Sequence, residues 1–268
     1  MQIVVTVKQV PEVADVQVDT KTGSIIREGV PSILNPFCEY ALDHALRLKA
    51  ACPEIRITAV SMGPPQAKAA LFRALELGAD RAVLACDRKF AGADTWATAL
   101  TLAQTIRKTV ADFNLIFVGK QAIDGDTAQV GPEIAEILSL PQISYGVFSE
   151  LIQGFKKIRV TKELEHGSQV VEARLPVLVS FSKGEIVRRV PSFADILAAR
   201  AKPFEIVTAE DLGMAEKDLG LSGSFTRVVK VFAPPTKQGG RILTDQDPAC
   251  ICREIMGFLE EKGHFTCG

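Results

Sequence analysis

Residues 55–85 read IRITAVSMGPPQAKAALFRALELGADRAVLA, and this stretch decides the fold. Ile55–Met62 is apolar and rich in β-branched residues, which predicts a buried strand that the following Gly-Pro-Pro ends. Ala67–Leu77 repeats apolar residues at helical spacing, and Ala82–Ala85 predicts another short strand. A strand, a crossover helix and a second strand form a parallel βαβ unit, so we expect a parallel sheet.

The same alternation continues on both sides of this stretch. Residues 2–7 predict the first strand, and residues 36–50 predict a helix with Asn35 as N-cap and Pro36 at its first position. Further elements are expected as a helix from Thr95 to about Ala111 that Asp94 caps, a strand over Leu115–Val118, and a helix to about Leu138 that Asp126 or Thr127 caps. We therefore expect an α/β fold with an open, mostly parallel, doubly wound sheet.

The alternation of strand and helix patterns ends at about Gln142. Lys156–Glu165 and Gln169–Glu185 predict strands joined by a turn at residues 166–168, which is typical of an antiparallel hairpin at a sheet edge. A short helix follows from Ser192 to Arg200, and an amphipathic helix spans Pro248 to Lys262. The signals between these helices are weak. We expect a nucleotide-binding domain over residues 1–201 and a C-terminal arm over 202–268 that contacts another subunit.

Composition excludes several classes of function. The 31 basic and 32 acidic side chains leave a net charge of −1, and aromatic residues make up 6%, so we expect no nucleic-acid partner. No apolar run approaches the roughly 20 residues of a membrane span, and no signal peptide is evident, so we expect a cytoplasmic protein.

The six cysteines and three histidines are not clustered, which predicts no metal site. No catalytic constellation or standard dinucleotide fingerprint is present, so any reactive chemistry belongs to a bound cofactor.

Four segments follow strands or open helices at the edge of the predicted sheet where ligands bind. They are Lys8–Pro11, Asn35–Cys38, Ser61–Pro64 and Gly119–Pro132. The last is polar and offers backbone N–H groups to phosphate at a helix N-terminus, although Asp124 and Asp126 would repel phosphate and suit ribose hydroxyls or capping better. The alternative interpretation of Gly119–Pro132 is a tight connection between a strand and a helix that binds no ligand.

Two helix starts and one strand end have both a structural and a ligand-binding interpretation. Asn35 can act as a helix cap alone. Gly63 would let a cofactor ring approach the backbone. Thr95 and Thr98 share one helix face, where they can donate hydrogen bonds to a cofactor or simply pack at the core edge.

Three runs carry a family resemblance. They are Asn35-Pro36-Phe37-Cys38-Glu39, Gly119-Lys120-Gln121-Ala122-Ile123-Asp124, and Leu175-Pro176 leading to Arg189-Val190-Pro191-Ser192. In this order they resemble the beta subunits of electron transfer flavoproteins, from Met1 to about Leu212. The resemblance implies a sheet similar to that of adenine nucleotide alpha hydrolases, a larger alpha subunit as partner, and a buried adenine nucleotide. It implies contacts to the nucleotide from Thr6, Lys8, Asn35, Pro36, Phe37, Cys38, Met62, Gly63, Thr95, Thr98, Gly119, Lys120, Gln121, Ala122, Ile123, Asp124, Gly125, Asp126, Thr127, Ala128, Gln129 and Val130.

Two groups of the family differ in what this site holds. Simpler members hold a structural AMP, whereas electron-bifurcating members hold FAD with NADH bound beside it. The runs over residues 7–11 and 23–31 are similar to the bifurcating group. We therefore expect FAD, with AMP as the alternative, and NAD(H) near Lys8–Pro11 and Met62–Pro65. A nucleotide-binding module without a redox role remains a third hypothesis.

The resemblance also implies a surface for partner dehydrogenases. The matching residues are Val190, Pro191, Ser192, Phe193, Ile196, Leu197 and Arg200. The expected partners are a flavin dehydrogenase of the acyl-CoA or lactate type and a low-potential acceptor such as ferredoxin. The segment holds fewer lysines than in many relatives, which leaves the identity of the dehydrogenase open.

Overall fold

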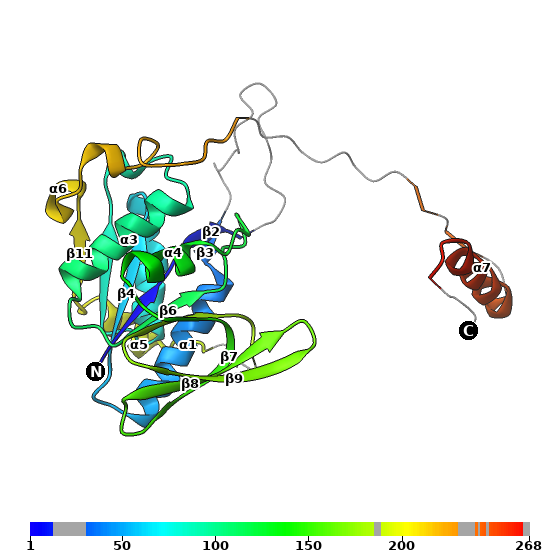
Figure 1. Cartoon of the computed structure of the whole chain (residues 1–268), viewed down its shortest axis with the longest axis horizontal. Helices are drawn as coiled ribbons and strands as arrows, with labels where there is room; N and C mark the ends of the chain where they lie inside the picture. Colours follow the sequence, from blue (N-terminus) through cyan, green and yellow to red (C-terminus); the bar gives the residue numbers. More distant parts are fainter. Residues whose placement is uncertain (13–30, 185–188, 230–238, 241, 245–246, 265–268) are drawn as a thin grey trace. The chain divides into compact units, whose positions relative to one another are not determined.

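The computed structural model describes residues 1–12, 31–184, 189–229, 239–240, 242–244 and 247–264 (Figure 1). Most of the run 23–31, on which the similarity to the bifurcating group partly rests, lies outside this range. By contacts the chain divides into two units, Met1–Val231 and Phe232–Gly268, and each is described by itself.

A nine-stranded sheet forms the first unit, in the order β11-β5-β4-β1-β6-β10-β7-β8-β9. Seven strands are parallel, and the last two are antiparallel. Their bounds are β1 Gln2–Thr6, β4 Arg56–Met62, β5 Arg81–Ala85, β6 Leu115–Gly119, β7 Gln142–Ile152, β8 Lys157–Leu164, β9 Gly167–Arg174, β10 Val177–Phe181 and β11 Phe204–Val207. From β1 the chain builds one side through β4 and β5 and then crosses to β6, so the point where the strand order reverses lies between β1 and β6.

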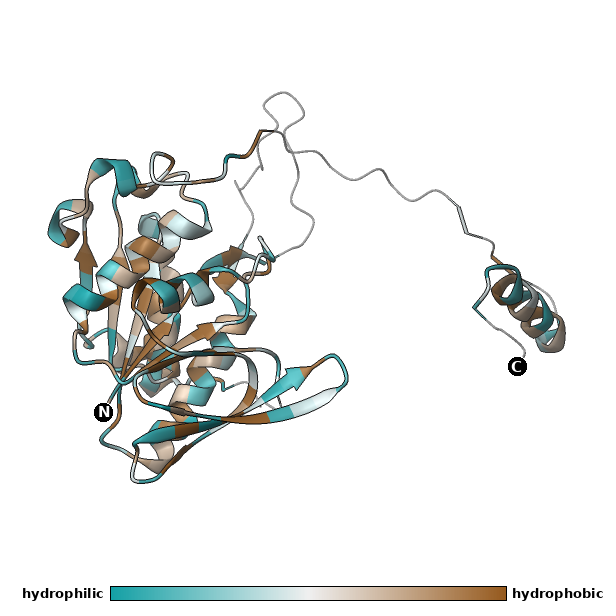
Figure 2. Cartoon of the chain, in the orientation of Figure 1, coloured by the Kyte–Doolittle hydropathy of each residue, from teal (hydrophilic) through white to brown (hydrophobic). Residues whose placement is uncertain are grey.

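Helices cover both faces of this sheet (Figure 1). Ile3 and Val5 of β1 belong to the core under α1 and α2, whereas Val4 belongs to the core under α3 and α4. This alternation follows from the two-residue period of a strand, and Figure 2 shows the apolar strands gathered between the helices. The remaining bounds are α1 Pro36–Ala51, α2 Lys68–Leu77, α3 Thr95–Thr109, α4 Val130–Ile137, α5 Phe193–Ala199, α6 Ala209–Leu212, the 3-10 turns Pro65–Ala67, Arg88–Phe90 and Glu216–Asp218, and a separate antiparallel pair, β2 Gln9–Pro11 and β3 Ser32–Leu34. The expected mostly parallel α/β architecture is confirmed.

The prediction of one strand over Gln169–Glu185 is wrong. The segment breaks at Leu175-Pro176 into β9 and β10, and β10 lies parallel between β6 and β7. All five residues of β10 are buried, as expected for a strand covered on both faces. Strand β7 was not predicted, and its burial follows no simple alternation.

The predicted cap of the fourth long helix is also wrong. Helix α4 begins at Val130, and Gln129 precedes it without a side-chain cap hydrogen bond. Asp126 and Thr127 lie instead in the loop before the helix. Asp126 and Ala128 have positive φ values of 49° and 56°, which a helical first turn does not allow.

The chain after residue 201 continues the first unit. Strand β11 pairs with β5, and Leu212 is buried in the core. Farther on, the Asp94 carboxylate accepts hydrogen bonds from the backbone N–H (2.9 Å) and the hydroxyl (3.0 Å) of Thr226. The contact boundary therefore falls after Val231 rather than at 201, and the subunit-contacting role of residues 202–268 stays a prediction.

The second unit contains helix α7, Pro248–Glu261, close to the predicted bounds. None of the residues of α7 is buried, and the Ile255 and Phe258 side chains are about half exposed. No described helix is long and apolar enough to cross a membrane. The described residues also hold no group of three metal-ligating side chains.

Candidate functional site

The reversal point of the strand order brings together the ends of β1 and β6 and the start of α1. Lys8 follows β1, and its carbonyl accepts a hydrogen bond from the backbone N–H of Asn35 at 2.9 Å. Lys120 follows β6, and its N–H donates to the carbonyl of Phe181 at 2.8 Å. Three of the four predicted segments therefore converge at this edge, with the backbone of each exit held in place.

Asn35 clamps the loop that follows β6. Its side chain is 1% exposed, and its Nδ2 donates to the Gln121 carbonyl at 2.8 Å and to the Cys38 Sγ at 3.2 Å. Its Oδ1 accepts the backbone N–H of Ile123 at 3.2 Å. The predicted N-cap position of Asn35 before α1 is confirmed, but its side chain makes no capping hydrogen bond to the helix backbone. The amide instead fixes the loop to the start of α1.

Gly119 permits the close approach of β6 to α1. A Cβ at this position would lie 2.7 Å from the carbonyl carbon of Phe37 and 2.8 Å from the backbone nitrogen of Cys38. Both neighbours are backbone atoms, which cannot move aside cheaply. Gly63 differs, because its Cβ would meet the Cβ of Ala67 at 2.9 Å. Packing within the turn into α2 is therefore enough to explain Gly63.

The acidic residues of the loop already have partners. Asp124 Oδ1 lies 2.6 Å from the Lys8 ammonium in an ion pair, and Asp126 Oδ1 accepts a 2.6 Å hydrogen bond from Gln121 Nε2. The carboxylates that were expected to repel phosphate are thus partly neutralised or held. Residues 123–127 are all exposed. The left-handed backbone at Asp126 costs about 1–2 kcal/mol, a kind of strain that clusters at ligand clamps.

The starts of α3 and α4 contact each other through Thr95. Its hydroxyl lies 3.0 Å from Glu133 Oε1 and 3.3 Å from Gln129 Oε1. Burial raises the pKa of Glu133, whose other oxygen has no hydrogen-bond partner among the described residues. Glu133 was not predicted as a site residue, although an acidic residue in the first turn of a helix was the available signal. Thr98 is half-buried one turn farther along α3.

Of the other predicted cofactor residues, Thr6 and Cys38 are buried, whereas Met62 and Lys120 are partly exposed. Thr6 is buried in β1 opposite Val60. Burial raises the pKa of the Cys38 thiol, so less of this cysteine is present as the reactive thiolate. Met62 is half-buried at the end of β4. The Lys120 ammonium lies 5.1 Å from the centre of the Tyr145 ring, next to the hairpin side of the sheet.

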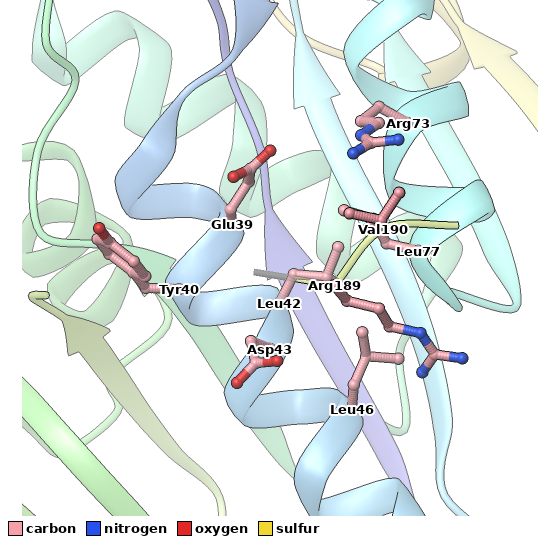
Figure 3. A pocket seen from close by; sticks show the side chains of 9 residues that line it. All are labelled: Glu39, Tyr40, Leu42, Asp43, Leu46, Arg73, Leu77, Arg189 and Val190. Atoms are coloured by element: carbon pink, nitrogen blue, oxygen red, sulfur yellow. The ribbon is translucent and has the colours of Figure 1, made fainter. Parts of the chain in front are cut away.

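The predicted partner segment is largely exposed. Val190, Phe193 and Leu197 are 82%, 75% and 50% exposed, and Ser192 forms a capping box with Asp195 at the start of α5. A cavity of about 240 Å³ lies beside this segment, between α1 and α2 (Figure 3). It is lined by Glu39, Tyr40, Leu42, Asp43, Leu46, Arg73, Leu77, Arg189 and Val190. None of these belongs to the predicted cofactor set, whereas Val190 belongs to the predicted partner set.

Comparison with known proteins identifies the family. A family model described as the electron transfer flavoprotein domain matches residues 22–212. The electron transfer flavoprotein subunit beta of Thermoanaerobacterium thermosaccharolyticum is 46% identical over 91% of this chain and 92% of its own length. The caffeyl-CoA reductase-Etf complex subunit CarD of Acetobacterium woodii is 42% identical over 98% and 99%, and Protein FixA of Azorhizobium caulinodans is 42% identical over 91% and 89%. The resemblance seen in the sequence is confirmed: the chain belongs to the electron transfer flavoprotein family, and its similarity there is to the beta subunits.

Proposed function

We propose that this beta subunit pairs with an alpha subunit, binds FAD and NAD(H), and divides the electrons of NADH between two routes. One route leads through the alpha-subunit FAD to a partner dehydrogenase, and the other leads to a low-potential acceptor such as ferredoxin. AMP in place of FAD, in a carrier that does not bifurcate, is the alternative. The observation that carries the proposal is the loop over residues 120–129, held by Asn35 and Lys8 at the edge where open α/β sheets bind ligands.

The groups at this edge fit the adenylate end of a cofactor. The N-terminus of α4 has no side-chain cap, so its backbone N–H groups remain available to a phosphate. Thr95 supplies a hydroxyl, and Lys8 a positive charge. FAD would supply the chemistry that accepts a hydride and passes on single electrons, while the residues of this chain bind and orient it. No catalytic side chain is required.

The partner surface is proposed on the segment from Val190 to Arg200. Its exposed apolar side chains suit a protein interface, because exposed apolar clusters mark interaction sites. The name of the Acetobacterium woodii relative includes caffeyl-CoA reductase, which favours an acyl-CoA-type dehydrogenase over a lactate-type one. For residues 202–268 we propose contact with the alpha subunit, since the apolar residues of α7 have no buried packing within their own unit.

Cofactor quantitation on the copurified heterodimer tests the proposal. Two flavins per heterodimer support FAD in this chain, whereas one flavin plus one AMP supports the carrier. Absence of any adenine nucleotide other than the alpha-subunit flavin would overturn the site. Anaerobic titration with NADH then tests the redox role, and a complex that NADH does not reduce overturns the bifurcation proposal.

Two asparagine variants separate the site from general stability. Asn35→Ala removes the clamp at the carboxyl edge of the sheet and is expected to lower the nucleotide retained on purification. Asn114→Ala is the matched control, because Asn114 Oδ1 accepts the Gln2 N–H at 2.8 Å at the opposite, amino edge. Equal nucleotide content in the two variants would contradict the assignment of the site to the carboxyl edge.

A further inference from the structure

The ion pair between Lys8 and Asp124 joins the two strands that flank the reversal point. Lys8 follows β1, and Asp124 lies in the loop after β6, 116 positions later in the chain. The Lys8 backbone is held by Asn35, whereas its side chain is 49% exposed. The backbone of Lys8 is therefore fixed, while its side chain is accessible to solvent.

This ion pair is easily exchanged. Exposed pairs contribute little net stability, because water screens them and holding both side chains costs entropy. The phosphate monoester of AMP offers Lys8 a stronger partner than one carboxylate, since the phosphate group carries more charge and more acceptor oxygens. Asp124 lies in an exposed stretch of the loop, although its side chain is only 23% exposed while it is paired, and departure of Lys8 would open the carboxylate to water.

Among the described residues, the contacts around the loop leave the Lys8 ammonium exposed beside Asp124, where it can meet a phosphate. Asp124, Asp126 and Glu133 are acidic, whereas Lys120 lies over the Tyr145 ring. Removing the charge of Lys8 would leave Asp124 without its ion-pair partner and make this edge less favourable for an anion.

We propose that Lys8 is the specificity-determining residue for the nucleotide phosphate, and that Asp124 is its counter-ion in the ligand-free state. When a nucleotide binds, its phosphate replaces Asp124 as the partner of Lys8. The inference rests on the proposed nucleotide site, and it names the group of this chain that distinguishes a nucleotide from a nucleoside.

Binding of AMP and of adenosine to the heterodimer, freed of bound nucleotide, tests the exchange. Lys8→Gln is expected to weaken AMP binding about tenfold and to reduce its salt dependence, because one charge pair with the phosphate is lost. Asp124→Asn is expected to strengthen AMP binding roughly threefold, because the competing partner is removed. Adenosine affinity should change in neither variant, and Lys8→Arg should keep AMP binding near the wild-type value.

Two control variants change charge equally at exposed positions outside the site. Lys217→Gln matches Lys8→Gln, and Asp112→Asn matches Asp124→Asn. If the Lys8, Asp124 and two control variants all bind AMP with the affinity of the wild type, the Lys8 inference is overturned and the proposed site remains. Weaker AMP binding in Asp124→Asn also overturns it, because Asp124 would then assist the ligand. If the wild-type complex binds neither AMP nor FAD, both proposals are overturned.

Discussion

The two sides of the nine-stranded sheet are buried to different extents. Strands β1, β6 and β10 are buried on both faces, with helices on each. In the hairpin, β8 buries one face, where Ile158 and Val160 join the core, whereas no residue of the edge strand β9 is fully buried. The loops of the candidate site leave the doubly covered strands, so they start from the part of the sheet with the least freedom to move.

This difference predicts that truncations cost most at the centre of the sheet. Phe117→Ala in β6 removes a fully buried ring that packs edge-to-face on Phe181, at a centroid distance of 4.8 Å. The expected loss in the free energy of unfolding is about 3–5 kcal/mol. Val170→Ala in β9, where the side chain is 60% exposed, should change it by less than about 0.5 kcal/mol. Urea unfolding measures both, and similar losses would contradict the comparison.

His44 lies where the doubly covered strands meet the hairpin side of the sheet, and its protonation tests how well that place is buried. It lies on α1, stacks on Phe181 of β10 at 4.1 Å, and has Nδ1 3.3 Å from the Ser149 hydroxyl of β7. Burial, with a smaller effect of Arg47, lowers the pKa of His44 to about 3. Between pH 6.5 and 3 the unfolded chain binds a proton that the folded chain does not, so stability falls as the pH drops.

The expected loss from this proton is about 2 kcal/mol between pH 6.5 and 5. His44→Phe removes it, so the fall in stability over this interval should be smaller by that amount, although the unpaired Ser149 lowers stability at every pH. His166→Gln in the exposed β8–β9 turn is the matched control and should follow the wild type. Equal pH slopes in the wild type and His44→Phe would show that the ring is not kept neutral by burial.

The same difference explains how far the sequence predicted the fold. Doubly buried strands read as continuous apolar runs between helical patterns, so the strands at Ile55–Met62 and Leu115–Val118 were predicted within a residue or two of their observed bounds. Residues 142–181 mix alternating and continuous burial, so β7 was missed and β9 and β10 were merged. Short-range pattern does not reveal that β10 inserts between β6 and β7, because strand order depends on tertiary packing.

For the candidate site, the sequence predicted which segments converge but not how they are held. The polarity of residues 119–130 after a buried strand indicated a binding loop. The amide of Asn35 reaching Gln121 and Ile123 is a contact across about 86–88 positions, which no local rule predicts. Local rules favoured Asn35 as a cap, because capping is the commonest use of an asparagine before a helix.

The smallest effect is expected on the solvent face of the hairpin. Arg159 of β8 donates to Glu150 of β7 at 2.9 Å and to Glu172 of β9 at 2.8 and 3.0 Å, and all three side chains are more than a third exposed. Arg159→Gln should therefore lower the urea midpoint only slightly at low salt and not measurably in about 1 M salt, where charges are screened within about 3 Å. A double-mutant cycle with Glu172→Gln isolates the pair, and its coupling should vanish over the same salt range. A coupling that persists in high salt would mean that the hairpin depends on its ion pairs as the centre of the sheet depends on Phe117, and the contrast between the two sides would no longer hold.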